Sequence, residues 1–118
     1  MNSKEASKKL LAEFKDCQKI LTAIGDETRQ YLISVMIMDK CEGSRVVDIA
    51  EKTALSRPAV SHHMQILKDA GLVTSRKEGT CIYYALNMDR TSVQKLLKLA
   101  KYIDELIVSG KDCEVDTQ

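Results

Sequence analysis

The sequence predicts a mostly α-helical domain with a small β-hairpin, arranged as a winged helix-turn-helix. Two short helices about a tight turn are expected over about residues 45–70, and two β-prone runs follow directly over about 72–87. Longer amphipathic helices are expected on either side, over about 4–24 and 89–108. With 118 residues, 44% hydrophobic and 30% charged, the chain fits one globular domain over 1–118. The expected element order is α-α-α-α-β-β-α.

The flanking helices are predicted from the spacing of their apolar residues. In the first, apolar side chains recur every three or four residues, and Gly25 ends the helix. A second helix is expected from a cap at Asp26 to about Met38, and it is apolar on nearly every side, which is typical of a buried central helix. The apolar positions of the last helix are Val93, Leu96, Leu97, Ala100, Ile103, Leu106 and Ile107.

The most informative stretch runs from Leu55 to Val73. Ser56 is placed to cap a helix, Pro58 falls in its first turn, and Gly71 is placed to end it. At 100° per residue one face is apolar, and it includes His63, which we interpret as a hydrogen-bonded packing residue. The opposite face is polar and includes His62. Since adjacent helical residues diverge by about 100°, the two histidines do not form a metal site.

The polar face of this helix predicts DNA reading. Arg, Gln, Ser and His side chains match the donors and acceptors of base edges in the major groove. Backbone phosphates need only a cation or a hydroxyl, and a basic wing reaches the adjacent minor groove or its phosphates. The candidate base readers are Arg57, Ser61, His62 and Gln65; the candidate phosphate contacts are Thr28, Ser56 and Lys68; the candidate wing contacts are Arg76 and Lys77. The alternative is an ordinary solvated helix face.

The charge distribution places any DNA contact in the middle of the chain. A net charge of +1 gives little support for nucleic-acid binding by itself. Residues 55–81 carry four cations against two acids, whereas residues 104–118 carry five acids against one lysine.

The four cysteines are expected to be reduced thiols. The chain has no apolar run of the roughly 18 residues that a membrane span requires, and its beginning lacks a signal-peptide core, so we expect a cytoplasmic protein without membrane contact. Cys17 lies on an apolar stripe and is interpreted as a buried structural thiol. A thiol-based redox sensor using Cys17, Cys41 and Cys113 is the alternative, whereas Cys81 begins a wing strand. No cysteine spacing indicates a metal site.

Three segments resemble the ArsR/SmtB family of bacterial winged-helix repressors. Residues 24–29, Ile-Gly-Asp-Glu-Thr-Arg, are similar to its LGDPTR segment, and residues 55–73 are similar to its reading helix. Arg76-Lys77-Glu78-Gly79 followed by residues 83–86, Tyr-Tyr-Ala-Leu, is similar to its wing. The resemblance spans about residues 20–87. It implies a homodimer that represses promoters and usually leaves DNA when an effector binds.

The sequence departs from the family pattern at three places. The positions of the family's Cys-x-Cys metal site hold Arg45 and Val47, and the last helix has no histidine for the family's other metal site. We therefore predict no metal and no cofactor, and the effector is not identified. Ala54 stands where the family often has glycine, at a cost of about 1 kcal/mol if its φ is positive.

The leading hypothesis is a homodimeric DNA-binding transcriptional regulator, a repressor that binds an inverted-repeat operator. The first and last helices have apolar stripes too wide for a small winged core, which favours a dimer through these helices. The alternatives are a winged helix that binds another protein and the thiol-based redox-responsive repressor. An enzyme is disfavoured because the chain has no phosphate loop, paired-carboxylate motif or nucleophile signature.

Overall fold

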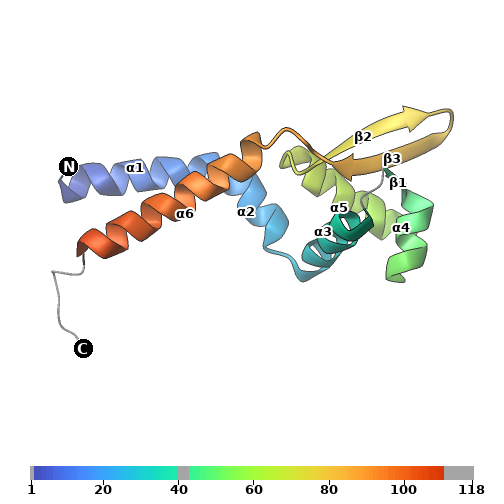
Figure 1. The fold of residues 1–118 in the computed structure, drawn as a ribbon, viewed down its shortest axis with the longest axis horizontal. Helices are drawn as coiled ribbons and strands as arrows, with labels where there is room; N and C mark the ends of the chain where they lie inside the picture. Colours follow the sequence, from blue (N-terminus) through green and yellow to red (C-terminus); the bar gives the residue numbers. More distant parts are fainter. Residues whose placement is uncertain (1, 40–42, 111–118) are drawn as a thin grey trace.

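The computed structural model describes residues 2–39 and 43–110 (Figure 1). Its elements in chain order are α1 Ser3–Asp16, α2 Gln18–Ile24, α3 Glu27–Asp39, β1 Ser44–Arg45, α4 Val46–Thr53, α5 Arg57–Asp69, β2 Val73–Glu78, β3 Cys81–Leu86 and α6 Thr91–Ser109. We call α1 and α6, which lie side by side, the arm, and α2 to β3 the winged unit. The winged helix-turn-helix prediction is confirmed. None of the helices described here is long and apolar enough to cross a membrane.

A three-stranded antiparallel sheet forms the wing. The strand order is β1-β3-β2, with Ser44 opposite Tyr84 and Val73 opposite Leu86. The β-prone runs 72–77 and 80–86 predict a turn at Glu78-Gly79 with glycine at the second position, and this expectation was wrong. The turn consists of Gly79 and Thr80, so glycine holds the first position, and its φ of 62° suits a tight turn. β1 was not predicted, because a strand of two residues is too short to show a periodicity.

The predicted helix over 4–24 is two helices, and this expectation was wrong. The chain bends at Cys17, whose backbone N–H donates to the carbonyl of Phe14 as a tighter final turn. The bend lets α1 pack on α6 while α2 packs on α3 and α5. An apolar repeat continues unchanged through such a bend, so the sequence pattern does not reveal it.

The helix expected to be buried on all sides, α3, is buried on one side only. Leu32 and Met36 face the core, whereas Tyr31, Ile37 and Met38 are exposed by 48%, 51% and 78%. The start of α3 agrees with the prediction, because the Asp26 carboxylate accepts a hydrogen bond from the Arg29 backbone N–H at 3.0 Å. The apolar pattern predicts that α3 is covered on all sides, but residues 2–39 and 43–110 leave one side of it exposed.

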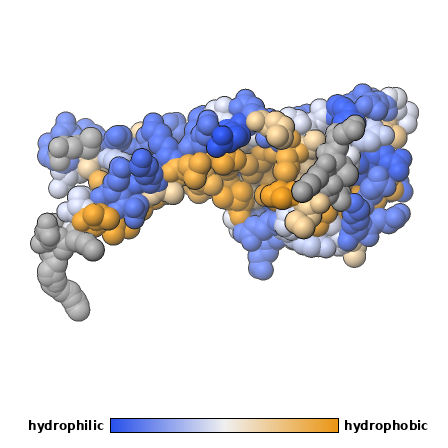
Figure 2. Space-filling view, viewed as in Figure 1, coloured by the Kyte–Doolittle hydropathy of each residue, from blue (hydrophilic) through white to orange (hydrophobic). Residues whose placement is uncertain are grey.

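The last helix, α6, has two apolar faces instead of one stripe. Leu99, which was not among the predicted stripe residues, is the buried side chain of the helix, and Leu96 and Ile103 pack beside it. A second set remains exposed: Val93, Leu97, Ala100 and Ile107. On the face drawn in Figure 2, hydrophobic surface gathers in the middle of the molecule and again at the outer end of the arm.

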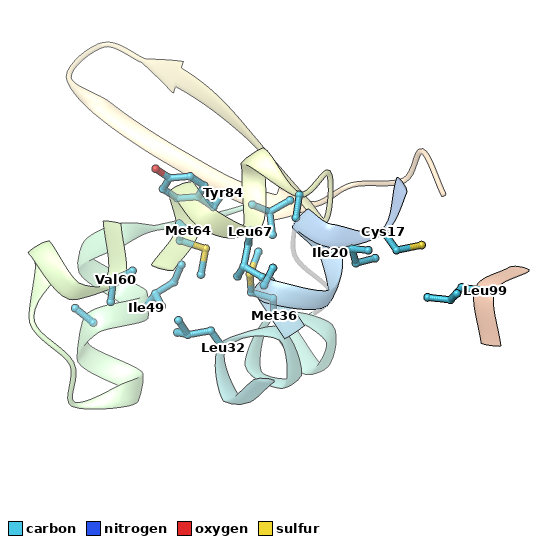
Figure 3. Close-up of a cluster of buried hydrophobic side chains, with 14 residues drawn as sticks. Cys17, Ile20, Leu32, Met36, Ile49, Val60, Met64, Leu67, Tyr84 and Leu99 are labelled. Carbon is cyan, nitrogen blue, oxygen red and sulfur yellow. The ribbon is translucent and has the colours of Figure 1, made fainter. Parts of the chain in front are cut away.

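The core of the winged unit is built around α5. Val60, Met64 and Leu67 on its inner face are fully buried, as their helical spacing predicted. They meet side chains from the surrounding elements, with Leu32 and Ile49 among the most deeply buried (Figure 3). Each large aliphatic side chain buried here contributes about 1.5–3 kcal/mol, which fixes the orientation of α5 in the domain.

The turn between α4 and α5 contains a strained residue. Ala54 has φ 60° and ψ 21°, a left-handed conformation, and among the residues described it is the one non-glycine with positive φ. We expect Ala54→Gly to raise the free energy of unfolding by about 1 kcal/mol, because glycine adopts this conformation without a Cβ clash. Urea denaturation checks the value; an unchanged or lower stability would contradict it.

Candidate nucleic-acid interface

The start of α5 is fixed by a side-chain cap. The hydroxyl of Ser56 accepts a hydrogen bond from the Ala59 backbone N–H at 3.2 Å, and Pro58 lies in the first turn, as predicted. At the other end Gly71 has φ 81°, and a Cβ there would collide with the Ser92 hydroxyl of α6. The close approach requires glycine, so Gly71 both ends the helix and sets its contact with the arm.

The structure brings the predicted base readers together on one exposed face of α5. Arg57, Ser61, His62 and Gln65 are all exposed, and Lys68 continues the same surface toward the end of the helix. They lie opposite the buried apolar side chains, so the division of the helix into two faces is confirmed. Among the other candidate phosphate contacts, Ser56 is exposed beside these residues, and Thr28 is half-buried at the start of α3.

One candidate reader is already engaged within the helix. The side-chain amide of Gln65 donates to the Asp69 carboxylate at 2.9 Å. A bidentate contact to adenine uses both the amide N–H and the carbonyl oxygen. Gln65 would therefore exchange its bond to Asp69 for a base contact, which reduces the net gain from that contact.

The two basic wing residues differ in their surroundings. The Arg76 guanidinium donates to the Glu78 carboxylate at 2.7 Å and lies over the Tyr83 ring at 4.6 Å. These contacts hold Arg76 along the strand, whereas the Lys77 side chain is exposed and forms no ion pair with the described residues. The tip itself is Gly79-Thr80, so both residues lie just before it.

A buried hydrogen-bond network around Arg29, which the sequence pattern did not predict, lies behind the exposed face of α5. Arg29, which is 9% exposed, donates to the carbonyls of Ala23 at 2.8 Å and Thr22 at 3.1 Å. Its third contact is His63 Nδ1 at 3.2 Å. A guanidinium only donates, so Nδ1 accepts and the neutral imidazole carries its proton on Nε2. The predicted packing role of His63 is thereby confirmed, and its partner Arg29 ties the end of α2 to α5.

The His63 contact predicts an acid-sensitive component of stability. Burial lowers the pKa of His63 from 6.5, and the charges of Arg29 and His62 lower it further, against an opposing effect of Asp26. The unfolded chain therefore binds this proton at a higher pH. The resulting stability is complete above about pH 6.5 and is lost as the pH falls through the lower folded-state pKa.

This component is measured by urea denaturation between pH 7.5 and 5. We expect His63→Gln, whose amide oxygen can also accept from Arg29, to flatten the pH dependence in that range. The control His62→Gln should keep most of the pH dependence, because burial is the largest cause of the lowered His63 pKa and the His62 charge is the smallest. Asp26 does not interfere, because its pKa is held below 3.8, chiefly by the hydrogen bond from the Arg29 backbone N–H. Equal slopes in the wild type and His63→Gln would contradict this assignment.

The structure describes two of the four cysteines, Cys17 and Cys81. Cys17 is 1% exposed, its thiol donates to the Lys95 carbonyl at 3.4 Å, and burial raises its pKa. Because the thiolate is the reactive form, these features favour the structural interpretation of Cys17. Cys41 and Cys113 lie outside the described residues, and Cys81 is half-buried at the start of β3.

The family's thiolate metal positions hold residues with other contacts. Arg45 forms a two-point ion pair with Asp48, at 3.0 and 3.2 Å, which joins β1 to the first turn of α4. Val47 is a half-buried aliphatic residue. Over residues 2–39 and 43–110, no three His, Cys, Asp or Glu side chains are grouped closely enough to hold a metal ion.

Comparison with known proteins agrees with this geometry. Residues 26–75 match the family described as "Bacterial regulatory protein, arsR family". An HTH-type transcriptional regulator of Methanocaldococcus jannaschii is 35% identical over 97 residues, which cover 81% of this chain and 100% of that protein. The transcriptional repressor SdpR of Bacillus subtilis is 39% identical over 70 residues, covering 58% and 72%.

A solved structure shows the same fold. The homodimeric winged helix-turn-helix DNA-binding domain of a possible ArsR-family regulator from Mycobacterium bovis superposes with a TM-score of 0.58. It is 23% identical, and the match covers 90% of this chain and 91% of that one. The family match, the relatives and the winged fold together show that the chain belongs to the arsR family of bacterial regulatory proteins and is a winged-helix transcriptional regulator.

Proposed function

We propose that this protein is a homodimeric repressor that binds an inverted-repeat operator in the cytoplasm. The observation that carries the proposal is the exposed row of Arg57, Ser61, His62 and Gln65 on a helix whose other face is locked into the core. A helix of this width fits the major groove, and residues near its start contact base edges. SdpR, the 39% identical relative, is itself a transcriptional repressor.

The arm supports the dimer. Val93 and Leu97 on α6 are 40% and 58% exposed, and Leu11 on α1 is 66% exposed. These apolar side chains lie on two helices that pack on each other, and the described residues leave them exposed. A two-fold axis through the arm would place two copies of α5 about one DNA turn apart, roughly 34 Å, which matches an inverted repeat.

The test is selection of genomic fragments with the purified full chain, followed by footprinting and titration at several salt concentrations. On the selected operator, Arg57→Ala removes one two-point base contact from each half-site, worth about 1–3 kcal/mol apiece, so binding should weaken by roughly 30-fold or more. The preference should relax at one base pair in each half-site. The wing variant Lys77→Gln should weaken all sequences alike and reduce the salt slope of the dimer by about two, one for each copy of Lys77.

Lys8→Gln is the matched control, because Lys8 is an exposed lysine near the outer end of α1. It should change neither sequence preference nor salt slope. The proposal fails if no fragment is enriched at low salt. It also fails if Arg57→Ala leaves both affinity and preference unchanged, since α5 would then not be the reading element.

A further inference from the structure

A cleft of about 640 Å³ lies where the arm meets the winged unit. Its walls come from the α1–α2 bend, the end of α5 and the start of α6, which lie close together in the fold (Figure 1). Gly71 and Ser92 contact each other in the lining, where absence of a Cβ allows the end of α5 to reach α6. A molecule in this cleft would touch both the reading helix and the arm.

The lining is strongly basic. Each of the four helices around the cleft contributes one lysine: Lys15, Lys19, Lys68 and Lys95. The opposing acids in the lining are Asp16 and Asp69, which leaves four positive charges against two negative ones. Asp69 already accepts the Gln65 amide. Within the described part of the chain, none of the four lysines forms an ion pair with a carboxylate.

The chemistry of the lining defines the ligand class. Ile20 and Ala70 are the aliphatic residues of the lining, whereas six of its eleven residues are charged. Lysine ammonium groups bind phosphate and carboxylate oxygens as point charges. Four of them converging from separate helices match a ligand with two or more anionic groups, since a single carboxylate would leave most of them unused. We propose that this cleft binds a small polyanion of the phosphate or polycarboxylate class.

Apart from Lys68, which is also a candidate phosphate contact, the lysines of this cleft are not among the residues of the proposed DNA and dimer surfaces. The last residues of α5 line the cleft, and they lie about 18 Å along the helix from Arg57. On α6, Ser92 and Lys95 are turned by roughly 100° or more from the exposed stripe of Val93 and Leu97. Dimerisation through that stripe would leave the cleft open. A recessed site at the far end of α5 favours a small ligand over the DNA backbone.

The test is isothermal titration of the full chain with inorganic pyrophosphate, and separately with citrate, in the absence of DNA. We expect one site per chain and a dissociation constant about tenfold weaker in Lys15→Gln/Lys95→Gln. This pair spares Lys68, which is a candidate phosphate contact. The matched control, Lys4→Gln/Lys8→Gln, removes two exposed charges from the outer part of α1 and should bind as the wild type does. Tighter pyrophosphate binding indicates a phosphate ligand, and tighter citrate binding a polycarboxylate.

Three results would overturn the proposal: no binding of either probe at millimolar concentration, equal weakening by the control pair, or loss of operator affinity in Lys15→Gln/Lys95→Gln with unchanged probe binding. The last result would assign the lysines to the DNA backbone. Only an effect of the bound polyanion on operator binding would rest on the proposed function; binding of the polyanion itself does not. Because the titration contains no DNA, a chain that bound pyrophosphate but no operator would refute the proposed function and not the site.

Discussion

Replacing Leu97 with Glu should convert the dimer into a folded monomer that no longer binds its operator at nanomolar concentration. Leu97 is 58% exposed in the single chain, so the fold tolerates a carboxylate there, whereas a two-fold interface would bury it twice. At about 2 kcal/mol or more for each buried carboxylate, the dissociation constant of the dimer should rise by roughly a thousandfold. Sedimentation equilibrium measures this constant, and gel-shift titration measures operator binding.

Gln94→Glu is the matched control, because it adds the same charge to an exposed polar position of α6, about 60° around the helix from Leu97 and outside the apolar stripe. It should leave the dimer and most of the operator affinity intact. If Leu97→Glu remained a dimer, the apolar face of α6 would not be the interface. Circular dichroism shows whether the variant retains its helices, so that loss of folding is not mistaken for loss of dimerisation.

Replacing Arg29 with Met should lower the free energy of unfolding by about 3 kcal/mol or more. The substitution keeps an unbranched apolar stem but removes the hydrogen bonds to the carbonyls of Thr22 and Ala23 and to His63. Hydrogen bonds from a charged donor contribute about 1.5–3 kcal/mol each, and the partners they leave behind are partly or fully buried. Urea denaturation at one fixed protein concentration measures the loss.

Arg45→Met serves as the control, since the side chain of Arg45 is 44% exposed and its ion pair with Asp48 lies at the surface. The same substitution there should cost less than about 1 kcal/mol. Comparable losses at the two positions would show that the buried network contributes nothing beyond a surface ion pair. Arg29→Lys should recover only part of the stability, because an ammonium cannot reach three acceptors in the fork geometry of a guanidinium.

Local signals determined much of the fold. Ser56, Pro58 and Gly71 act within a few residues of their own position, so the bounds of α5 follow from cap chemistry and backbone conformation alone. The same holds for the two faces of α5, because helical periodicity separates Val60 from Ser61 without reference to any other element. The exposed polar face of α5 therefore follows from the sequence alone.

Other features depend on partners distant in the chain. The bend at Cys17 follows from the packing of α1 on α6 and of α2 on α5, and the apolar repeat is the same on both sides of it. The buried role of Leu99 and the exposure of Leu97 depend on which side of α6 meets α1, while both residues are leucine in the sequence. Arg29 illustrates the point most clearly. In the sequence it resembles any charged residue, and only the folded chain brings it within 3.2 Å of His63, 34 positions later.

The sequence by itself determined the winged helix-turn-helix, the polar face of α5 and the residue types at Arg45 and Val47, because each depends on residue type and short-range spacing. Only the tertiary structure decided the division of α1 from α2, the Arg29 network and the convergence of Lys15, Lys68 and Lys95 on one cleft. The physical reason is the distance along the chain over which each kind of interaction acts. Caps and periodicities act over one or two helical turns, whereas burial and charge clusters arise when the folded chain brings remote residues together.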